Sequence, residues 1–184
     1  MDLTEKTVEQ KYIYKGKVVT LRVDSVELPN GKPGSREVIE HRGAVAVVPL
    51  TDERELVLVR QYRYPFSSTV WEIPAGKLDP GETPLECGKR ELLEETGATA
   101  QNYIDLGLYY PTPAYCCEQI HLFGATGLTF TAQSLDEDEF LEVKKFPLEQ
   151  VVEMIKHNEI PDGKTQAAVL KLHLLIKTDG IKYL

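Results

Sequence analysis

The sequence contains few cysteines, and they lack the spacing of a disulfide framework. The three thiols are Cys87, Cys116 and Cys117. Because their number is odd and two of them are adjacent, they do not pair into a framework, and a reducing cytoplasm suits them best. The four histidines are scattered without ligand spacing. These absences leave Cys-His nucleophilic chemistry without support, and we assign the histidines no chemistry.

Long apolar runs and excess positive charge are also missing. No run approaches the roughly 18–20 residues of a membrane span, and the N-terminus MDLTEKTVEQ lacks the character of a signal peptide. We therefore expect no membrane association. The net charge is −8 and the pI is near 5.1, so an electrostatic surface for nucleic acid is not expected. If such an acidic protein acts on an anionic substrate, it needs local arginines or bound cations.

The sequence that is present suits an ordinary folded domain. Its 184 residues are enough for one domain, or for one domain with a small appendage. A content of 42% hydrophobic and 27% charged residues is typical of soluble globular proteins. The sequence contains no internal repeat and no low-complexity tract, so repeat architectures are not expected.

The N-terminal part predicts a small antiparallel sheet. Residues 11–28 alternate apolar and polar side chains over much of their length, and residues 29–34 (PNGKPG) form a concentrated turn signal. Residues 36–40 (REVIE) then return as a strand. A sheet of this size can be too small to close a core by itself. We therefore expect it to pack on the main domain or on a second subunit.

The remainder of the chain predicts a mixed sheet between helices. Residues 43–50 (GAVAVVPL) form a continuous apolar run, typical of a strand buried on both faces. Residues 55–64 form the next strand, which we expect to pair with the first as a hairpin. Further strands are expected over residues 103–110, 119–123 and 140–146, a loop over residues 128–138, and helices over residues 147–157 and 165–176. This order indicates an α/β (α+β) fold.

Residues 76–98 (GKLDPGETPLECGKRELLEETGA) contain a helix with well-marked ends. Thr83 suits the N-cap, Pro84 suits the first helical position, and Glu86 completes a Thr-x-x-Glu capping box. Gly97 follows the last helical residue, where a left-handed residue usually falls. At about 100° per residue, one side of the helix carries apolar residues and the other side carries the glutamates. The apolar side contains Leu85, Leu92 and Thr96, and the other contains Glu91, Glu94 and Glu95.

These three glutamates are unfavourable for folding. Each pair of like charges at this spacing costs about 0.2–0.5 kcal/mol. Each acidic group near the helix C-terminus costs roughly a further 0.3–1 kcal/mol against the helix dipole. Closely spaced carboxylates are the ligands that a hard divalent cation such as Mg²⁺ prefers. The alternative interpretation is a solvated acidic face, in which Arg90 pairs with Glu86 or Glu94.

The same stretch resembles the Nudix box of the Nudix hydrolases. The match comprises Gly76, then Glu82 after five residues, and after seven more residues the run RELLEETGA over 90–98. Every fixed position of this 23-residue motif is matched, with the small Ala98 at the final aliphatic position. The resemblance implies a Nudix-type α/β/α sandwich. It also implies hydrolysis of a nucleoside diphosphate linked to another group, with a divalent metal that is usually Mg²⁺.

The resemblance implies roles for individual residues. Glu91 and Glu95 are the best-matched metal ligands, and Glu95 is also counted among the catalytic residues. The Ala75 carbonyl and Glu94 complete the implied metal site, with Glu94 as a bridging or outer ligand. Glu82 is expected to reach the metal through water, and Arg90 is expected to hold the glutamates in place.

Outside the box, the chain resembles the ADP-ribose pyrophosphatase branch of the family over nearly its full length. The matching segments are VELPNGKPGSREVIEH, GAVAVVPL, RQYRYP, WEIPAG and LDEDEFLEV. In that branch the N-terminal sheet is exchanged between two subunits. The resemblance therefore implies that residues 1–41 form an N-terminal β-sheet subdomain exchanged in a homodimer. Residues 42–184 then form the Nudix catalytic domain.

The branch also implies substrate-binding residues and a general base. Arg36 and Glu37 match positions that hold the terminal nucleoside, and Arg63 matches an arginine that binds the phosphates. The alternative for these residues is a set of exposed strand charges. The base is expected in the acidic loop over residues 135–139, where Glu137 is favoured and Glu139 is next. For this loop the alternative is solvation without chemistry.

Two departures from the branch concern substrate recognition. Residues 112–118 (TPAYCCE) stand where the branch usually has Ser-Pro-Gly ahead of a glutamate. Lys17 stands where some relatives place an aromatic side chain that stacks on adenine. These differences affect recognition of the terminal sugar and of the adenine, and they lie outside the Nudix box.

The expected function is Mg²⁺-dependent cleavage of ADP-ribose to AMP and ribose 5-phosphate by a cytoplasmic homodimer, with Mn²⁺ as an alternative cation. Two other functions remain open. One is a pyrophosphatase for another nucleoside diphosphate sugar or a modified nucleotide. The other is a non-catalytic, ADP-ribose-binding regulatory Nudix domain, against which the intact glutamates and the acidic loop argue.

Overall fold

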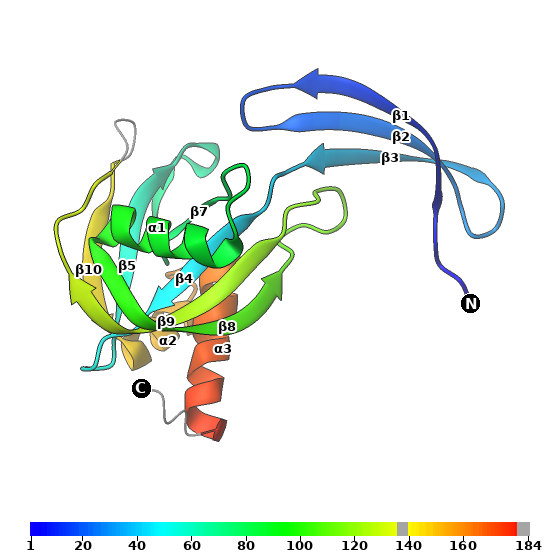
Figure 1. The fold of residues 1–184 in the computed structure, drawn as a ribbon. Helices are drawn as coiled ribbons and strands as arrows, with labels where there is room; N and C mark the ends of the chain where they lie inside the picture. Colours follow the sequence, from blue (N-terminus) through cyan, green and yellow to red (C-terminus); the bar gives the residue numbers. More distant parts are fainter. Residues whose placement is uncertain (136–139, 180–184) are drawn as a thin grey trace. The chain divides into compact units, whose positions relative to one another are not determined.

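The computed structural model describes residues 1–135 and 140–179 (Figure 1). The chain divides into two compact units. The first contains Met1–Gly43 and Tyr110–Gln119, and the second contains Ala44–Tyr109 and Ile120–Leu184. Residues 110–119 therefore belong with the N-terminal segment, although they lie far from it in the sequence.

The first unit is built on an antiparallel sheet of three strands. Its strands are β1 (Lys6–Lys15), β2 (Thr20–Glu27) and β3 (Pro33–Glu40), in the order β1-β2-β3. The turn expected between the second and third strands is present, with Gly31 at a φ of 77°, a value that favours glycine. Residues 110–119 attach to the end of β3, because the Ile39 amide donates to the Tyr115 carbonyl and the Cys117 amide donates to the Ile39 carbonyl.

The second unit contains two sheets. The larger is mixed and has the order β7-β4-β9-β8, in which β4 runs parallel to β9. Its strands are β4 (Ala44–Pro49), β7 (Ala75–Lys77), β8 (Ala98–Tyr109) and β9 (Ile120–Phe130). The smaller sheet is antiparallel and has the order β10-β5-β6, with strands β5 (Glu55–Arg63), β6 (Ser68–Glu72) and β10 (Glu142–Pro147). A 3₁₀ turn, η1 (Tyr64–Phe66), joins β5 to β6.

Strand β4 is buried on both faces, as its apolar run predicts. Its side chains alternate between two cores. Val45 and Val47 pack in a cluster with Cys87 and Leu92 of helix α1 (Pro84–Thr96). The alternate residues of β4 join the larger core with residues of β5, α2 (Leu148–Lys156) and α3 (Gly163–Asp179). Helices thus cover both faces of this strand, and the expected mixed α/β fold is confirmed (Figure 1).

The expected hairpin between β4 and β5 is wrong. The two strands lie in different sheets, and an isolated bridge between Leu50 and Leu56 joins them at the turn. Arg54 in this turn has a φ of 63°. The cause is burial: Val48 and Leu58 belong to the same core, so the strands pack through their side chains where a hairpin would pair their backbones.

Several element boundaries also differ from those expected. The strand expected over residues 119–123 continues to Phe130, because β8 is long enough to pair with it as far as Ala98 opposite Phe130. The loop expected from residue 128 therefore begins later. Helix α3 runs from Gly163 to Asp179, about one turn longer than the expected helix, whereas α2 ends within one residue of its expected bounds.

Candidate active site

Helix α1 has the expected ends. The Thr83 hydroxyl accepts from the Glu86 amide at 3.3 Å, and a Glu86 carboxylate oxygen accepts from the Thr83 amide at 2.9 Å. This reciprocal pair is the predicted capping box. At the other end, Gly97 has a φ of 68° and its amide donates to the Leu93 carbonyl. The helix that carries the glutamates is therefore defined by local sequence.

Burial on this helix agrees with the expected apolar side at Leu92 and Thr96, and differs from expectation at Leu85 and at two of the glutamates. Glu91 and Glu95 are buried, at 8% and 2% exposure, whereas Leu85 is exposed. The reason is Gly88, whose missing side chain lets the helix approach Val45 and Val47 closely. That approach turns the neighbouring positions inward. A solvated acidic face is therefore wrong for Glu91 and Glu95.

Both buried carboxylates lie against the backbone of β7. The Ala75 amide donates to Oε2 of Glu95 at 3.0 Å. The Glu91 carboxylate occupies the space beside Gly76, where an added Cβ would lie 1.8 Å from Oε1 of Glu91. The first glycine of the box is therefore required because a carboxylate fills the volume of its side chain. The strand β7 and the helix α1 together form the site.

Arg90 joins three of the carboxylates. Its Nε and Nη2 donate to the two oxygens of Glu82, each at 2.9 Å. Its Nη1 donates to Glu91 at 2.8 Å and to Glu94 at 3.0 Å. The expected role of holding the glutamates matches these contacts, whereas the alternative pairing with Glu86 is absent because Glu86 binds the cap. The hydrogen bonds from Arg90 lower the pKa of Glu82 to about 2.

The charge on this cluster is out of balance. The carboxylates of Glu82, Glu91 and Glu94 carry −3 against +1 on Arg90, which leaves −2 before Glu95 is counted. Oxygen donors with excess negative charge fit a hard divalent cation. Within the described residues, no three His, Cys, Asp or Glu side chains stand at the spacing of a preformed metal site. The donor chemistry fits Mg²⁺, and the Arg90 contacts hold two of the donors.

Arg63 forms an ion pair that sequence reasoning missed. Its Nε and Nη2 donate to the two oxygens of Glu72, each at 2.7 Å. Lys164 binds the same Glu72 carboxylate. Burial acts to raise the pKa of Glu72, but the hydrogen bonds from Arg63 and the charge of Lys164 outweigh it and hold this pKa below its ordinary value. An acidic residue beside Trp71 and Ile73 was the available signal, because charges at such positions need partners.

The remaining expected residues fall elsewhere. Arg36 and Glu37 lie on β3 in the first unit, whereas the glutamates and Arg63 lie in the second. Arg36 pairs with Glu5, with Nε donating at 2.8 Å. Glu137 and Glu139 lie outside the described residues.

The chain that leads toward the acidic loop is attached to the end of α1. The Ser134 amide donates to the Glu94 carbonyl at 3.2 Å, and the Gln133 side chain donates to the Glu95 carbonyl. The Thr131 amide donates to the Gly97 carbonyl at 2.7 Å. Residues 131–134 therefore lie against the C-terminal end of the helix that carries the glutamates.

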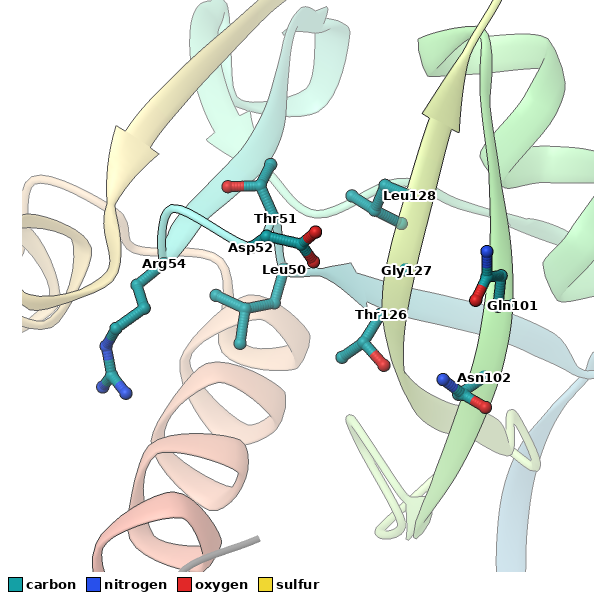
Figure 2. A pocket seen from close by; sticks show the side chains of 9 residues that line it. All are labelled: Leu50, Thr51, Asp52, Arg54, Gln101, Asn102, Thr126, Gly127 and Leu128. Carbon is teal, nitrogen blue, oxygen red and sulfur yellow. The ribbon is translucent and has the colours of Figure 1, made fainter. Parts of the chain in front are cut away.

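A separate pocket of about 470 Å³ lies at the end of β4 that is remote from β7 (Figure 2). Figure 2 shows side chains from the turn after β4, from β8 and from β9 around it. Its lining residues are Leu50, Thr51, Asp52, Arg54, Gln101, Asn102, Thr126, Gly127 and Leu128. None of the expected site residues lines this pocket. The expected metal chemistry is therefore assigned to the glutamates of α1 and not to the pocket.

Comparison with known proteins assigns the class. A NUDIX domain model matches residues 40–168, and a model of the nucleoside diphosphate sugar hydrolase N-terminal domain matches residues 5–39. The chain therefore belongs to the Nudix hydrolase family, and it is an enzyme of that class. The site on α1 and β7 is the part of the fold that carries the family motif.

Relatives sharpen the assignment. The chain is 44% identical over 174 residues to an ADP-ribose pyrophosphatase of Bacillus subtilis (strain 168), which covers 94% of each protein. It is also 44% identical over 172 residues to a methanol dehydrogenase activator of Bacillus methanolicus, which covers 92% of this chain and 93% of that protein. The expected resemblance to ADP-ribose pyrophosphatases is confirmed.

A solved structure supports the fold. The crystal structure of an ADP compounds hydrolase superimposes with a TM-score of 0.86 and covers 98% of each chain at 24% identity. Within the described part of the chain, no helix is both long and apolar enough to cross a membrane.

Proposed function

We propose that this protein hydrolyses the pyrophosphate of ADP-ribose to AMP and ribose 5-phosphate in the cytoplasm, with Mg²⁺ or alternatively Mn²⁺. The observation that carries the proposal is the burial of Glu91 and Glu95 against the backbone of Ala75 and Gly76. Buried carboxylates are costly unless charge compensates them. The similarity to an ADP-ribose pyrophosphatase over nearly the whole chain supports the choice of substrate.

Glu91, Glu94, Glu95 and the Ala75 carbonyl would hold the cation. Its chemistry, when bound, would be to neutralise pyrophosphate charge and to lower the pKa of the attacking water. Arg90 binds Glu91 and Glu94, and so keeps their carboxylates close to β7 while sharing their charge. Arg63 adds a second positive group, and its planar guanidinium suits a phosphate. The side chains thus supply position and charge, which is most of what phosphoryl transfer requires.

Glu137 is the proposed general base, with Glu139 as the next candidate. Support comes from the attachment of Ser134 to the Glu94 carbonyl. Glu137 is three residues beyond Ser134 in the sequence, and three residues span at most about 10 Å. A general base must lie within hydrogen-bond reach of the attacking water, and the attachment of Ser134 to the end of α1 is the observation that supports Glu137 in this role.

The first unit supplies the proposed nucleoside-binding residues, Arg36 and Glu37. We infer that residues 1–41 are exchanged between two copies of the chain, so that each substrate contacts both subunits, and that residues 42–184 form the catalytic domain. Support comes from the separate N-terminal model match over residues 5–39 and from the exposure of β1 along its whole length.

Turnover with the Glu95→Gln variant tests the proposal. Wild-type protein with ADP-ribose and Mg²⁺ in ¹⁸O-labelled water is expected to yield AMP and ribose 5-phosphate, and the label reports which phosphorus is attacked. Glu95→Gln is expected to lose at least about 100-fold in kcat, since it removes a charged ligand. Glu153→Gln, an exposed carboxylate paired with Lys156 on α2, is the matched control. Full hydrolysis by Glu95→Gln would contradict the ligand assignment.

One specific observation favours a second function. The 44% identity to a methanol dehydrogenase activator supports the regulatory alternative, in which the chain changes the activity of another enzyme. A nucleotide panel with product analysis separates ADP-ribose from other nucleoside diphosphate sugars and modified nucleotides. Binding of ADP-ribose without hydrolysis of any member of the panel would favour the non-catalytic role.

A further inference from the structure

Glu72 is a buried carboxylate with two cationic partners. Its side chain is 3% exposed, yet it binds Arg63 through both oxygens and also binds Lys164. Lys164, at 12% exposure, also lies 3.0 Å from Asp162. The two carboxylates and the two cations balance, so the group as a whole is neutral. We call these four residues the Glu72 cluster.

The position of Lys164 is unfavourable for a residue that serves folding alone. It lies in the first turn of α3, where the helix dipole favours anions and disfavours cations. Burying an ion pair also costs desolvation, and apolar replacements of such pairs are often neutral or stabilising. A purely structural tie between β6 and α3 remains the competing explanation, and the experiment below is designed against it.

The Glu72 cluster lies next to the proposed metal site along the chain. Glu72 precedes Ala75 by three residues, and the amide of the intervening Ile73 donates to the Thr165 hydroxyl at 3.0 Å. The Ala75 amide then donates to Glu95. The segment from Glu72 to Ala75 is therefore held by α3 at Glu72 and Ile73, and by Glu95 of α1 at Ala75. The hydrogen bonds that Arg63 donates to Glu72 raise the pKa of Arg63, and the charge of Glu95 contributes to the same shift.

The geometry leaves one side of the Arg63 guanidinium for a ligand. Glu72 accepts one hydrogen bond from Nε and one from Nη2, so within the described residues Nη1 is left to face a phosphate. A carboxylate that binds a guanidinium by two parallel hydrogen bonds fixes both its plane and its direction. Lys164 in turn restrains the carboxylate by binding the oxygen Oε2, which also accepts from Arg63.

We propose that Glu72 and Lys164 are positioning residues that aim Arg63 at the substrate phosphate. Lys164 holds the Glu72 carboxylate, and Glu72 holds the guanidinium with Nη1 toward the ligand. This inference rests on the proposed function in one respect, namely that Arg63 binds phosphate. Neither Glu72 nor Lys164 contacts substrate in this scheme, so their effects must act through Arg63.

A double-mutant cycle tests this dependence. The variants are Glu72→Gln, Arg63→Met and the combination of both. The measurements are KM and kcat for ADP-ribose with Mg²⁺, and the Kd of a methylene-bridged ADP-ribose analogue by calorimetry. Each single change is expected to weaken analogue binding about tenfold or more, as for a lost hydrogen bond to a charged group. The double variant is expected to lie within about twofold of Arg63→Met, because effects through one residue do not add.

Two further variants separate positioning from structure. Lys164→Met is expected to weaken analogue binding about three- to tenfold, and Lys164→Arg to restore most of it, because a cation again holds Glu72. Glu142→Gln is the matched control. Its carboxylate, on β10, pairs at 2.7 Å with Arg60, which lies on the same strand β5 as Arg63. We expect the Kd of the analogue to change by no more than about twofold in this variant. If Glu72→Gln fails to fold, the Lys164 pair carries the test.

The outcomes distinguish this inference from the proposed function. If wild-type protein hydrolyses ADP-ribose but the effects of Glu72→Gln and Arg63→Met multiply, the positioning role is wrong and the function stands. If it binds the analogue without hydrolysis, the function fails, and the cycle in Kd still decides the positioning role. If it neither hydrolyses ADP-ribose nor binds the analogue, both are overturned.

Discussion

At the scale of single residues, the site depends on close packing between backbone and carboxylate. Gly76 leaves a space that Glu91 fills, and the Ala75 amide supplies a hydrogen bond to Glu95. Arg90 then distributes one positive charge over three acidic partners. The contacts at Gly76 and Ala75 place the carboxylate oxygens of Glu91 and Glu95 next to β7. The chemistry is therefore sensitive to changes as small as one methyl group.

Gly76→Ala is expected to displace the Glu91 carboxylate. The added Cβ would lie 1.8 Å from Oε1 of Glu91, so the side chain has to move. We expect the Mg²⁺ concentration for half-maximal activity to rise about tenfold or more, with a loss of about 1–3 kcal/mol in the free energy of unfolding. Gly31→Ala is the control, because Gly31 has positive φ but no neighbour within 4 Å. Unchanged metal activation in Gly76→Ala would contradict the assignment.

Glu82 predicts an acid-dependent contribution to stability. Hydrogen bonds from Arg90 lower its pKa to about 2, below the value of 4.5 for a free group. A lowered folded-state pKa stabilises the protein fully above about pH 4.5, and the contribution disappears as the pH falls toward about 2. Urea unfolding of wild type and Glu82→Gln at pH 7, 4.5, 3 and 2 measures it. The wild type should be more stable at pH 7, and the difference should vanish near pH 2; a difference independent of pH would contradict the Arg90 pairing.

At the scale of elements, two helices hold the strand that leads into the box. Helix α1 carries Glu91 and Glu95 onto β7, and its ends are defined by Thr83 and Gly97. The N-terminus of α3 binds the chain just before β7, through Thr165 to the Ile73 amide and through Lys164 to Glu72. The position of β7 therefore depends on residues about 90 positions further along the chain. Substitutions at the N-terminus of α3 should therefore weaken metal binding, because they displace the strand β7.

Thr165→Val tests this connection. The hydroxyl of Thr165 accepts from the Ile73 amide at 3.0 Å and donates to Asp162 at 2.6 Å. Valine keeps the shape but leaves a buried amide without an acceptor, which costs about 1–3 kcal/mol of unfolding free energy. Urea unfolding should show this loss, and metal activation should weaken with it. Thr178→Val, at an exposed position of the same helix, should change stability by less than about 0.5 kcal/mol; equal losses in both variants would contradict the connection.

At the scale of the whole molecule, the two units differ in how much apolar core each one has. The second unit has two apolar cores built from β4 and its neighbours. The first unit has a three-stranded sheet with an exposed strand β1, which carries apolar residues such as Val8, Ile13 and Tyr14. A small sheet of this kind needs a further surface for stability. This need supports the proposed exchange of residues 1–41 between two copies.

The dimer is tested by mass in solution. Light scattering at micromolar concentration should give about twice the chain mass of 20.7 kDa. Ile13→Glu places a charge on the exposed strand β1 and should shift the mass toward one chain, with a rise in KM for ADP-ribose of about tenfold or more. Leu174→Glu, at an exposed apolar position of α3, is the control and should stay dimeric. A wild-type mass of one chain would rule out a shared nucleoside site.

The features predicted correctly from sequence are local. The ends of α1 follow from Thr83, Glu86 and Gly97, which lie within one helix length, and the burial of β4 follows from its unbroken apolar run. The Nudix box needs 23 consecutive residues, and the family assignment depends on it. Such signals survive in a linear sequence because their physical cause acts between near neighbours.

Tertiary structure decided the rest. The sheets that β4 and β5 join, the inward turn of Glu91 and Glu95, and the cluster at Glu72 depend on contacts between distant segments. Helical periodicity separated Leu85, Leu92 and Thr96 from the glutamates. Leu92 and Thr96 are buried, but Glu91 and Glu95 are buried too, whereas Leu85 is exposed. Periodicity records which side chains share a face. Only the surface against which that face packs determines which one is buried, and that surface is built from residues far along the chain.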